Sequence, residues 1–258
     1  MTNRFEEASL GRDASDMPPP VLAGMDASRS TRKASVIAGL GLLLIAALAG
    51  FAKLVVVDGL VTPGDAAKTA EDIIASEGMF RFGIASLYLA VILDVVVAWA
   101  LMRVFNPVNM SVSRLGAWFR LAYAGVFMVA LSQLAGIPHL LQDEKYSAVF
   151  GVDQSRAQAL LRVDAFNDIW LAGLVLFGVH LLIIGYLAYK SGYVPRPLGI
   201  LIAIAGFGYC FDTFSAVLSQ GSPITISTVT FIGEFLLACW LLIRGRRISI
   251  AAAGPQGT

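Results

Sequence analysis

Residues 169–218 read IWLAGLVLFGVHLLIIGYLAYKSGYVPRPLGILIAIAGFGYCFDTFSAVL. It holds two apolar runs, 169–189 and 198–218, separated by a short turn that contains Lys190 and Arg196. At about 1.5 Å per residue, each run is long enough to cross a hydrocarbon core of about 30 Å. Lipid offers no hydrogen-bond partners to backbone amides and carbonyls, so runs of this length are stable only as helices. The stretch therefore predicts a transmembrane helical hairpin.

The same pattern recurs along the chain. Further apolar runs of similar length occupy residues 35–57, 79–102, 115–137 and 224–243. The chain is 57% hydrophobic and only 14% charged, whereas an ordinary soluble domain has roughly 25% charged residues. A single soluble core cannot bury this much apolar surface in a chain of 258 residues, so we expect lipid to be the solvent. We predict an all-α polytopic membrane bundle of six transmembrane helices.

Polar segments precede and follow the six runs. Residues 1–34 are polar and include three consecutive prolines. Such a segment cannot bury enough apolar area to offset the entropy lost on ordering, so it is expected to be disordered. The first apolar run begins only near Val36, which argues against a cleavable signal peptide. We therefore divide the chain into a disordered cytoplasmic tail (1–34), a six-helix transmembrane domain (35–244) and a cytoplasmic C-terminal tail (245–258).

Lysine and arginine are concentrated in alternate segments between the runs. These segments contain Arg29, Arg32, Lys33, Arg103, Arg114, Lys190, Arg196, Arg244, Arg246 and Arg247. The loops between them are acidic, of mixed charge or uncharged. Because short cytoplasmic loops carry an excess of Lys and Arg, the alternation predicts that both termini are cytoplasmic. We predict a multi-pass protein of the cell (inner) membrane.

Two loops on the predicted outer side contain amphipathic segments. Pro63, Gly64 and Asp65 are typical of a helix start with Asp65 as N-cap, and they predict a short helix over 66–75. Residues 147–164 show a second helical pattern of apolar residues. Each short helix is interpreted either as lying on the bilayer surface or as a lid over a cavity that opens outward.

Several ionisable side chains fall inside the apolar runs, namely Asp94, Arg120, His180, Asp212 and Glu234. A charged side chain at the centre of a transmembrane helix costs roughly 2.5–3.5 kcal/mol on insertion scales. Counted from the basic residues at the inner helix ends, Asp94, His180 and Glu234 share a level near the midplane, and Arg120 lies about one turn nearer the cytoplasm. We predict that these four meet in the bundle interior, where Arg120 neutralises Asp94 or Glu234.

Asp212 lies nearer the outer surface than this level. Its expected partners are Arg81, or Asn167 and Asp168, at the outer ends of other helices. Tyr209 is one turn earlier on the same helix, so its side chain shares the face of Asp212. We therefore predict a secondary outer cluster of Arg81, Asp168, Tyr209 and Asp212.

Metal and cofactor sites are not indicated. The chain has two cysteines and two histidines, none of them at metal-ligand spacing, and it has no phosphate-binding glycine motif. We expect no cofactor. The formal net charge of +1 gives no field that would attract nucleic acid. The expected partners are the lipid bilayer and a small polar ligand or a proton, and the sequence does not indicate an oligomeric state.

Several motifs in fixed order resemble a known bacterial family. They are LD at 93–94, NPVN at 106–109, FRL at 119–121, FGVHLLIIGYLAYKSGYVPR at 177–196, AGFGY at 205–209 with Asp212, and GEFLLACW at 233–240. Together they resemble the integral membrane family catalogued as domain of unknown function 4386, over about residues 34–244. The resemblance implies an integral membrane protein and no established activity.

Three functional hypotheses remain open at this point. The first is a small carrier or sensor that binds a polar ligand or a proton at Asp94, Arg120, His180 and Glu234. The second is a membrane enzyme acting on a lipid or quinone, with His180 and a carboxylate as acid and base. The third is a scaffold in which the polar residues only stabilise helix packing.

The predicted topology is testable with reporter fusions. Reporters fused after Ala66 and Gln154 should behave as external, and reporters fused after Asn109 and Gly192 should behave as internal, because the basic loops stay in the cytoplasm. Alkaline phosphatase and green fluorescent protein fusions measure the two sides. An external signal after Asn109 would contradict the assigned orientation.

Overall fold

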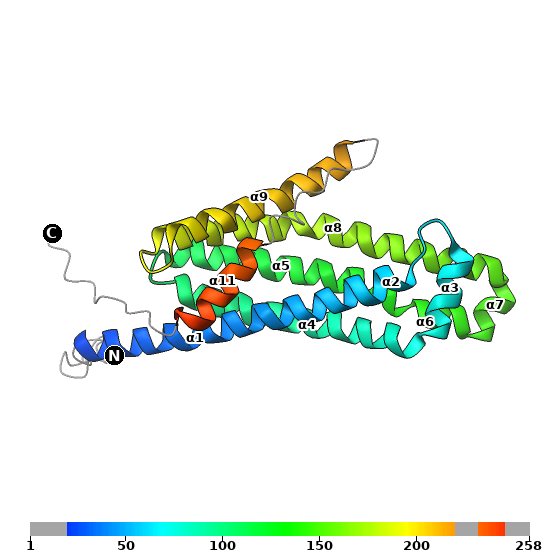
Figure 1. Ribbon diagram of the computed structural model, residues 1–258, viewed down its shortest axis with the longest axis horizontal. Coiled ribbons are helices and arrows are strands. Elements are labelled where there is room, and N and C mark those ends of the chain that lie inside the picture. Colours follow the sequence, from blue (N-terminus) through cyan, green and yellow to red (C-terminus); the bar gives the residue numbers. More distant parts are fainter. Residues whose placement is uncertain (1–19, 220–231, 246–258) are drawn as a thin grey trace, which may run out of the picture.

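The computed structural model describes residues 20–219 and 232–245, and every regular element in these ranges is a helix. The helices are α1 (Pro20–Gly50), the π-helical η2 (Phe51–Val57), α2 (Asp58–Leu60), α3 (Ala66–Ala75), α4 (Glu77–Phe105), α5 (Met110–Ala135), α6 (Ile137–Gln142), α7 (Glu144–Phe150), α8 (Val152–Lys190), α9 (Arg196–Leu218) and α11 (Ile232–Ile243). Figure 1 shows the long helices running lengthwise through the molecule, with short helices gathered at one end.

Within the described residues, 5 helical segments are long and apolar enough to cross a membrane. They are Ser28–Leu60, Glu77–Phe105, Met110–Gln142, Val152–Lys190 and Arg196–Leu218. The sixth predicted run contains the shorter apolar helix α11, and its first part, 224–231, lies outside the described residues. The predicted all-α polytopic bundle is confirmed.

Six helices form a closed ring. In ring order α1 packs on α4, α4 on α5, α5 on α8, α8 on α9 and α9 on α11, and α11 returns to α1. Two hydrogen bonds link helices of the ring at the end of the bundle where α1 enters. The Tyr193 hydroxyl donates to the Val104 carbonyl at 2.7 Å, and the Ser35 hydroxyl donates to the Leu241 carbonyl at 2.9 Å. The ring has an interior to which every helix can contribute a side chain.

The backbones of α8 and α9 touch along a row of glycines. A Cβ added at Gly185 would lie 2.8 Å from the Gly199 carbonyl oxygen, and one added at Gly206 would lie 2.6 Å from the Gly178 carbonyl oxygen. Small residues allow this close approach, which maximises van der Waals contact where lipid supplies no hydrophobic drive between helices. The hairpin that the sequence predicts is therefore held together by backbone packing.

Helix α11 is seated in the same way on both of its neighbours. A Cβ at Gly39 of α1 would lie 2.9 Å from the Ala238 carbonyl oxygen of α11. On the other side, a Cβ at Gly233 would lie 2.7 Å from the Leu201 carbonyl oxygen of α9. Two glycines thus fix how deeply α11 sits in the ring.

The first helix begins earlier than the sequence predicted. Residues 1–19 of the predicted tail lie outside the described residues, but α1 already starts at Pro20. The reason is contact with α4: Thr31 is buried, and the Arg103 guanidinium donates to the Ser30 hydroxyl at 3.0 Å. These contacts compensate for the polar sequence, so the boundary predicted at residue 35 lies within a continuous helix.

The end of the bundle opposite the start of α1 is covered by short helices, as Figure 1 shows for α3, α6 and α7. Helix α3 starts as predicted, since the Asp65 carboxylate accepts from the Lys68 amide at 2.9 Å, and its buried Ile73 faces the bundle. The second predicted outer helix, 147–164, is not a separate element. Gly151, with φ of +79°, ends α7, and α8 then runs for 39 residues without a break.

The continuity of α8 has a physical cause. No proline or glycine interrupts residues 152–172, and Ala159, Val163 and Phe166 are buried on the same face as the rest of the helix. At 1.5 Å per residue α8 is about 58 Å long, so its outer part extends well beyond a hydrocarbon core of about 30 Å. The first part of α8 thus lies with the short helices α3, α6 and α7 at this end of the bundle.

The glycine contact between α8 and α9 predicts a stability effect. Gly185→Ala should lower the free energy of unfolding by about 1–3 kcal/mol, because the added methyl group meets backbone atoms that cannot move aside. Gly125→Ala is the matched control: nothing lies within 4 Å of its Cβ position, so this change should be neutral or stabilise by up to about 1 kcal/mol. Unfolding in detergent micelles measures both, and equal stabilities for the two variants would contradict the packing described here.

Candidate functional site

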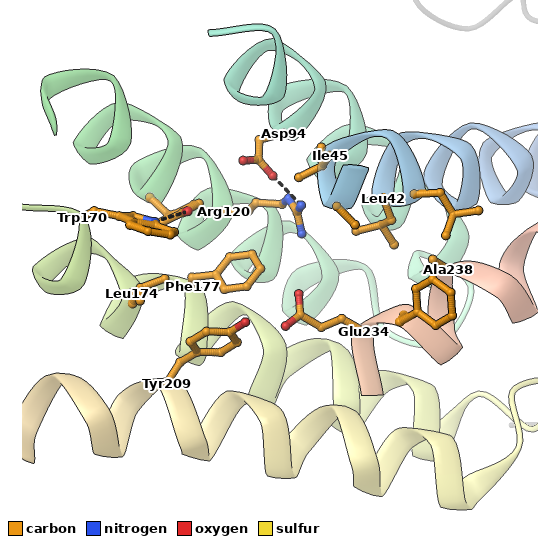
Figure 2. A pocket seen from close by; sticks show the side chains of 14 residues that line it. Leu42, Ile45, Asp94, Arg120, Trp170, Leu174, Phe177, Tyr209, Glu234 and Ala238 are labelled. Carbon is orange, nitrogen blue, oxygen red and sulfur yellow. Dashed lines mark hydrogen bonds and ion pairs between the residues drawn. The ribbon is translucent and has the colours of Figure 1, made fainter. Parts of the chain in front are cut away.

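The predicted central residues meet inside the ring. Asp94 on α4, Arg120 on α5 and His180 on α8 are 3%, 1% and 0% exposed. Glu234 on α11 faces the same interior from the opposite side, as Figure 2 shows. Helix depth counted in the sequence predicted that these four residues would meet.

Arg120 forms a buried ion pair with Asp94. Its Nη2 donates to the Asp94 carboxylate, and both side chains are almost fully enclosed. Its carbon Cζ also lies 5.2 Å from the centroid of the Phe177 ring, a cation–π contact. A guanidinium at this depth needs an opposite charge nearby, and Asp94 supplies it.

His180 holds the other side of the same guanidinium. Its Nδ1 lies 2.8 Å from the Gly116 carbonyl oxygen, and its Nε2 lies 3.3 Å from Nη1 of Arg120. Because a carbonyl only accepts hydrogen bonds, the proton sits on Nδ1, and Nε2 accepts from Arg120. His180 is therefore a neutral imidazole with both nitrogens engaged, and it positions Arg120.

A cavity of about 190 Å³ lies beside the ion pair. Every helix of the ring contributes to its wall. The lining side chains that carry polar atoms are Asp94, Arg120, Tyr123, Trp170, Tyr209 and Glu234, and the others are aliphatic side chains or phenyl rings. Since a cavity of about 150 Å³ accommodates a benzene ring, this one has room for a small organic molecule. His180 is not among the described residues that line it.

Glu234 is the second carboxyl group that lines the cavity, and it is not part of the ion pair. Its Oε1 is fully buried and has no hydrogen-bond partner among the described residues, and the same holds for Nε of Arg120. The Tyr209 hydroxyl points toward the Glu234 carboxyl group (Figure 2). A buried polar atom without a partner costs about 1–3 kcal/mol, and more when it is charged, so Glu234 is the group in this cavity with unused bonding capacity.

An aromatic wall adjoins these polar groups. The Phe177 ring packs against Tyr123 and Tyr209, with centroids 4.9 Å and 5.4 Å away. The Trp170 indole donates to the Tyr123 hydroxyl at 3.0 Å. Sequence reasoning missed this wall. The available signal was the spacing of Tyr123 three residues after Arg120, and of Phe177 three residues before His180, which puts each ring on the face of a buried polar residue.

The residues of the predicted outer cluster lie on three helices, α4, α8 and α9. Arg81 pairs with Glu77, one turn earlier in its own helix, and Asp168 is exposed. Tyr209 lines the central cavity, and Asp212 is buried about one helical turn farther along α9. The grouping of these four residues stays a prediction, because depth alone does not say which helices are neighbours. In the ring, α4 packs on α1 and α5, and α9 packs on α8 and α11.

A comparison with protein families agrees with this architecture. The family model described as a domain of unknown function, DUF4386, matches residues 37–245. The chain belongs to this family. The DUF4386 region includes the second part of α1, all of the other five helices of the ring and every described residue that lines the central cavity. The resemblance seen in the sequence motifs is confirmed.

A curated relative comes from an archaeon. The chain is 35% identical over 174 residues to a protein of Archaeoglobus fulgidus described as uncharacterized, and the match covers 67% of this chain and 90% of the relative. No solved structure matches the chain. Neither comparison supplies an activity.

The buried ion pair predicts an asymmetry between single and double substitutions. Arg120→Met should lower the free energy of unfolding by about 3–5 kcal/mol, because it leaves the Asp94 carboxylate buried without its partner. Adding Asp94→Leu should recover most of this loss. Arg81→Met is the matched control, since its exposed pair with Glu77 contributes at most about 1 kcal/mol. Unfolding of purified protein in detergent gives all three values, and a double variant as unstable as Arg120→Met would contradict the pairing.

Proposed function

We propose that this protein is a carrier or sensor of the cell membrane that binds a small ligand and a proton in the central cavity, with Glu234 as the binding carboxyl group. One observation carries the proposal. A buried carboxyl oxygen without a hydrogen-bond partner among the described residues adjoins a cavity of about 190 Å³ to which every helix of the ring contributes. A buried ionisable residue inside a membrane-spanning bundle is by default a candidate for ligand or proton binding.

The structural alternative accounts for only part of the cluster. Asp94, Arg120 and His180 bond to one another across the packed helices α4, α5 and α8. A further carboxyl group would not add to a purely stabilising network, because each buried polar atom without a hydrogen-bond partner lowers the stability of the fold. Glu234 therefore favours a functional site next to a structural ion pair.

The enzyme alternative gains less support. An acid or base must come within hydrogen-bond distance of the reacting group. His180 has both nitrogens engaged by Gly116 and Arg120, and Arg120 separates it from the cavity. The cavity thus offers a binding carboxyl group without the acid–base partner that the sequence suggested.

The proposal includes an orientation in the membrane. The basic residues Arg103, Lys190, Arg196 and Arg244 lie at helix ends on the side where α1 enters the bundle. By the positive-inside rule this side faces the cytoplasm. The short helices α3, α6 and α7 then lie on the outer side.

The proton at Glu234 is testable by chemical labelling. Dicyclohexylcarbodiimide is an apolar reagent that modifies carboxyl groups in their protonated form. In detergent-purified protein at neutral pH it should modify Glu234, whose Oε1 has no partner among the described residues, and it should spare Asp94, whose carboxylate is paired with Arg120. Peptide mapping by mass spectrometry locates the adduct.

Two variants serve as controls for this labelling. Glu234→Gln should abolish the adduct while the protein stays folded, and Glu77→Gln, which alters an exposed carboxylate, should leave it unchanged. A folded protein that is modified at Asp94 and not at Glu234 would refute the assignment of the proton. Joint loss of folding in Glu234→Gln and Asp94→Asn would favour the scaffold hypothesis.

A further inference from the structure

The charges around the cavity do not cancel unless something positive joins them. Arg120 and Asp94 neutralise each other, and His180 is neutral in the tautomer that its partners require. Ionised Glu234 would leave the cavity with one negative charge. Arg120 is the only cationic side chain among the described lining residues. Since an uncompensated charge is costly at low dielectric, Glu234 needs either a proton or a positively charged ligand.

The walls near Glu234 suit an organic cation. Tyr209 and Phe177 meet edge to face, with centroids 5.4 Å apart, and Trp170 lies farther along the same wall. Aromatic faces attract alkylammonium groups through their quadrupoles, most strongly where water is excluded. The remaining wall is largely aliphatic, with Leu42 and Leu174 as examples. The lining therefore matches a ligand with an apolar body and one positive charge.

An anionic ligand fits this cavity poorly. The Arg120 guanidinium is already shared between Asp94 and His180, which leaves only its Nε without a partner. An anion would also meet two carboxyl groups across a small space. The volume of about 190 Å³ limits any occupant to roughly the size of a substituted benzene ring.

We propose that the cavity binds a small lipophilic monocation, a protonated amine or a quaternary ammonium ion, in one-for-one exchange with a proton on Glu234. The Glu234 carboxylic acid releases its proton to water, and the resulting carboxylate pairs with the ammonium group. The charge of the site is the same before and after the exchange. This inference rests on the proposed function, because it names the ligand of that site.

The experiment uses the full-length protein in detergent with phenyltrimethylammonium as probe. Titration calorimetry gives Kd, and a pH-sensitive dye in weak buffer counts the protons released. We expect about one proton released per bound probe, and Kd should rise about tenfold for each unit by which the pH is lowered while Glu234 is protonated. tert-Butylbenzene, in which carbon replaces the charged nitrogen, should bind at least tenfold more weakly and release no proton.

Variants test the two recognition elements separately. Glu234→Gln should weaken probe binding by about tenfold or more and abolish proton release, because the counter-charge is lost. Tyr209→Phe keeps the ring and should change Kd by less than about threefold, whereas Tyr209→Leu should raise Kd roughly tenfold. Thermal unfolding of each variant shows that a loss of binding is not a loss of fold.

The outcomes distinguish this inference from the function it rests on. Equal affinity for the cation and for tert-butylbenzene, without proton release, would overturn the cation proposal and leave a ligand cavity in place. If phenyltrimethylammonium, benzylammonium and tetramethylammonium all fail to bind while the carbodiimide still modifies Glu234, the cation proposal is wrong and the proton site stands. If neither binding nor modification occurs in folded protein, both proposals fail.

Discussion

The ion pair between Arg120 and Asp94 is the interaction on which the rest of the bundle depends. A guanidinium at this depth cannot face hydrocarbon, so α5 must turn it inward and α4 must meet it with a carboxylate. His180 engages the opposite edge of the same group and so fixes the facing side of α8. One buried charge thereby sets the rotation of three helices about their axes. These rotations leave large apolar side chains on the lipid-facing surface, such as Trp118, which is 66% exposed.

Sequence reasoning recovered what depends on depth and missed what depends on neighbours. The level of Asp94 and Arg120 along their helices could be counted from the basic loops, and the structure pairs them. The partner of Asp212 could not be derived in the same way, because the order of helices around a ring is set by close packing such as that between Gly185 and Gly199. This packing leaves a weak trace in a single sequence, since glycine is common in membrane helices for several reasons.

The cavity is a product of the last helix. Without α11 the other five helices would form an open arc, and the wall that holds Glu234 would be missing. Gly39 and Gly233 let α11 sit deep enough for its carboxyl group to approach Tyr209 and Arg120 (Figure 2). The ion pair thus depends on the packing of α4 and α5, and the position of the Glu234 carboxyl group depends on the packing of α11 against α1 and α9.

The hydrogen bond from His180 to Gly116 has a mechanical consequence. Gly116 lies one helical turn before Arg120 on α5. The His180 imidazole therefore bonds to the α5 backbone at Gly116 and to the Arg120 side chain one turn later. Turning α5 relative to α8 would break both contacts together. With the glycine-packed α9 attached to α8, these three helices constitute a stiff half of the molecule. If the cavity binds a ligand as proposed, the rearrangement that admits it is expected where α11 and α1 meet their neighbours.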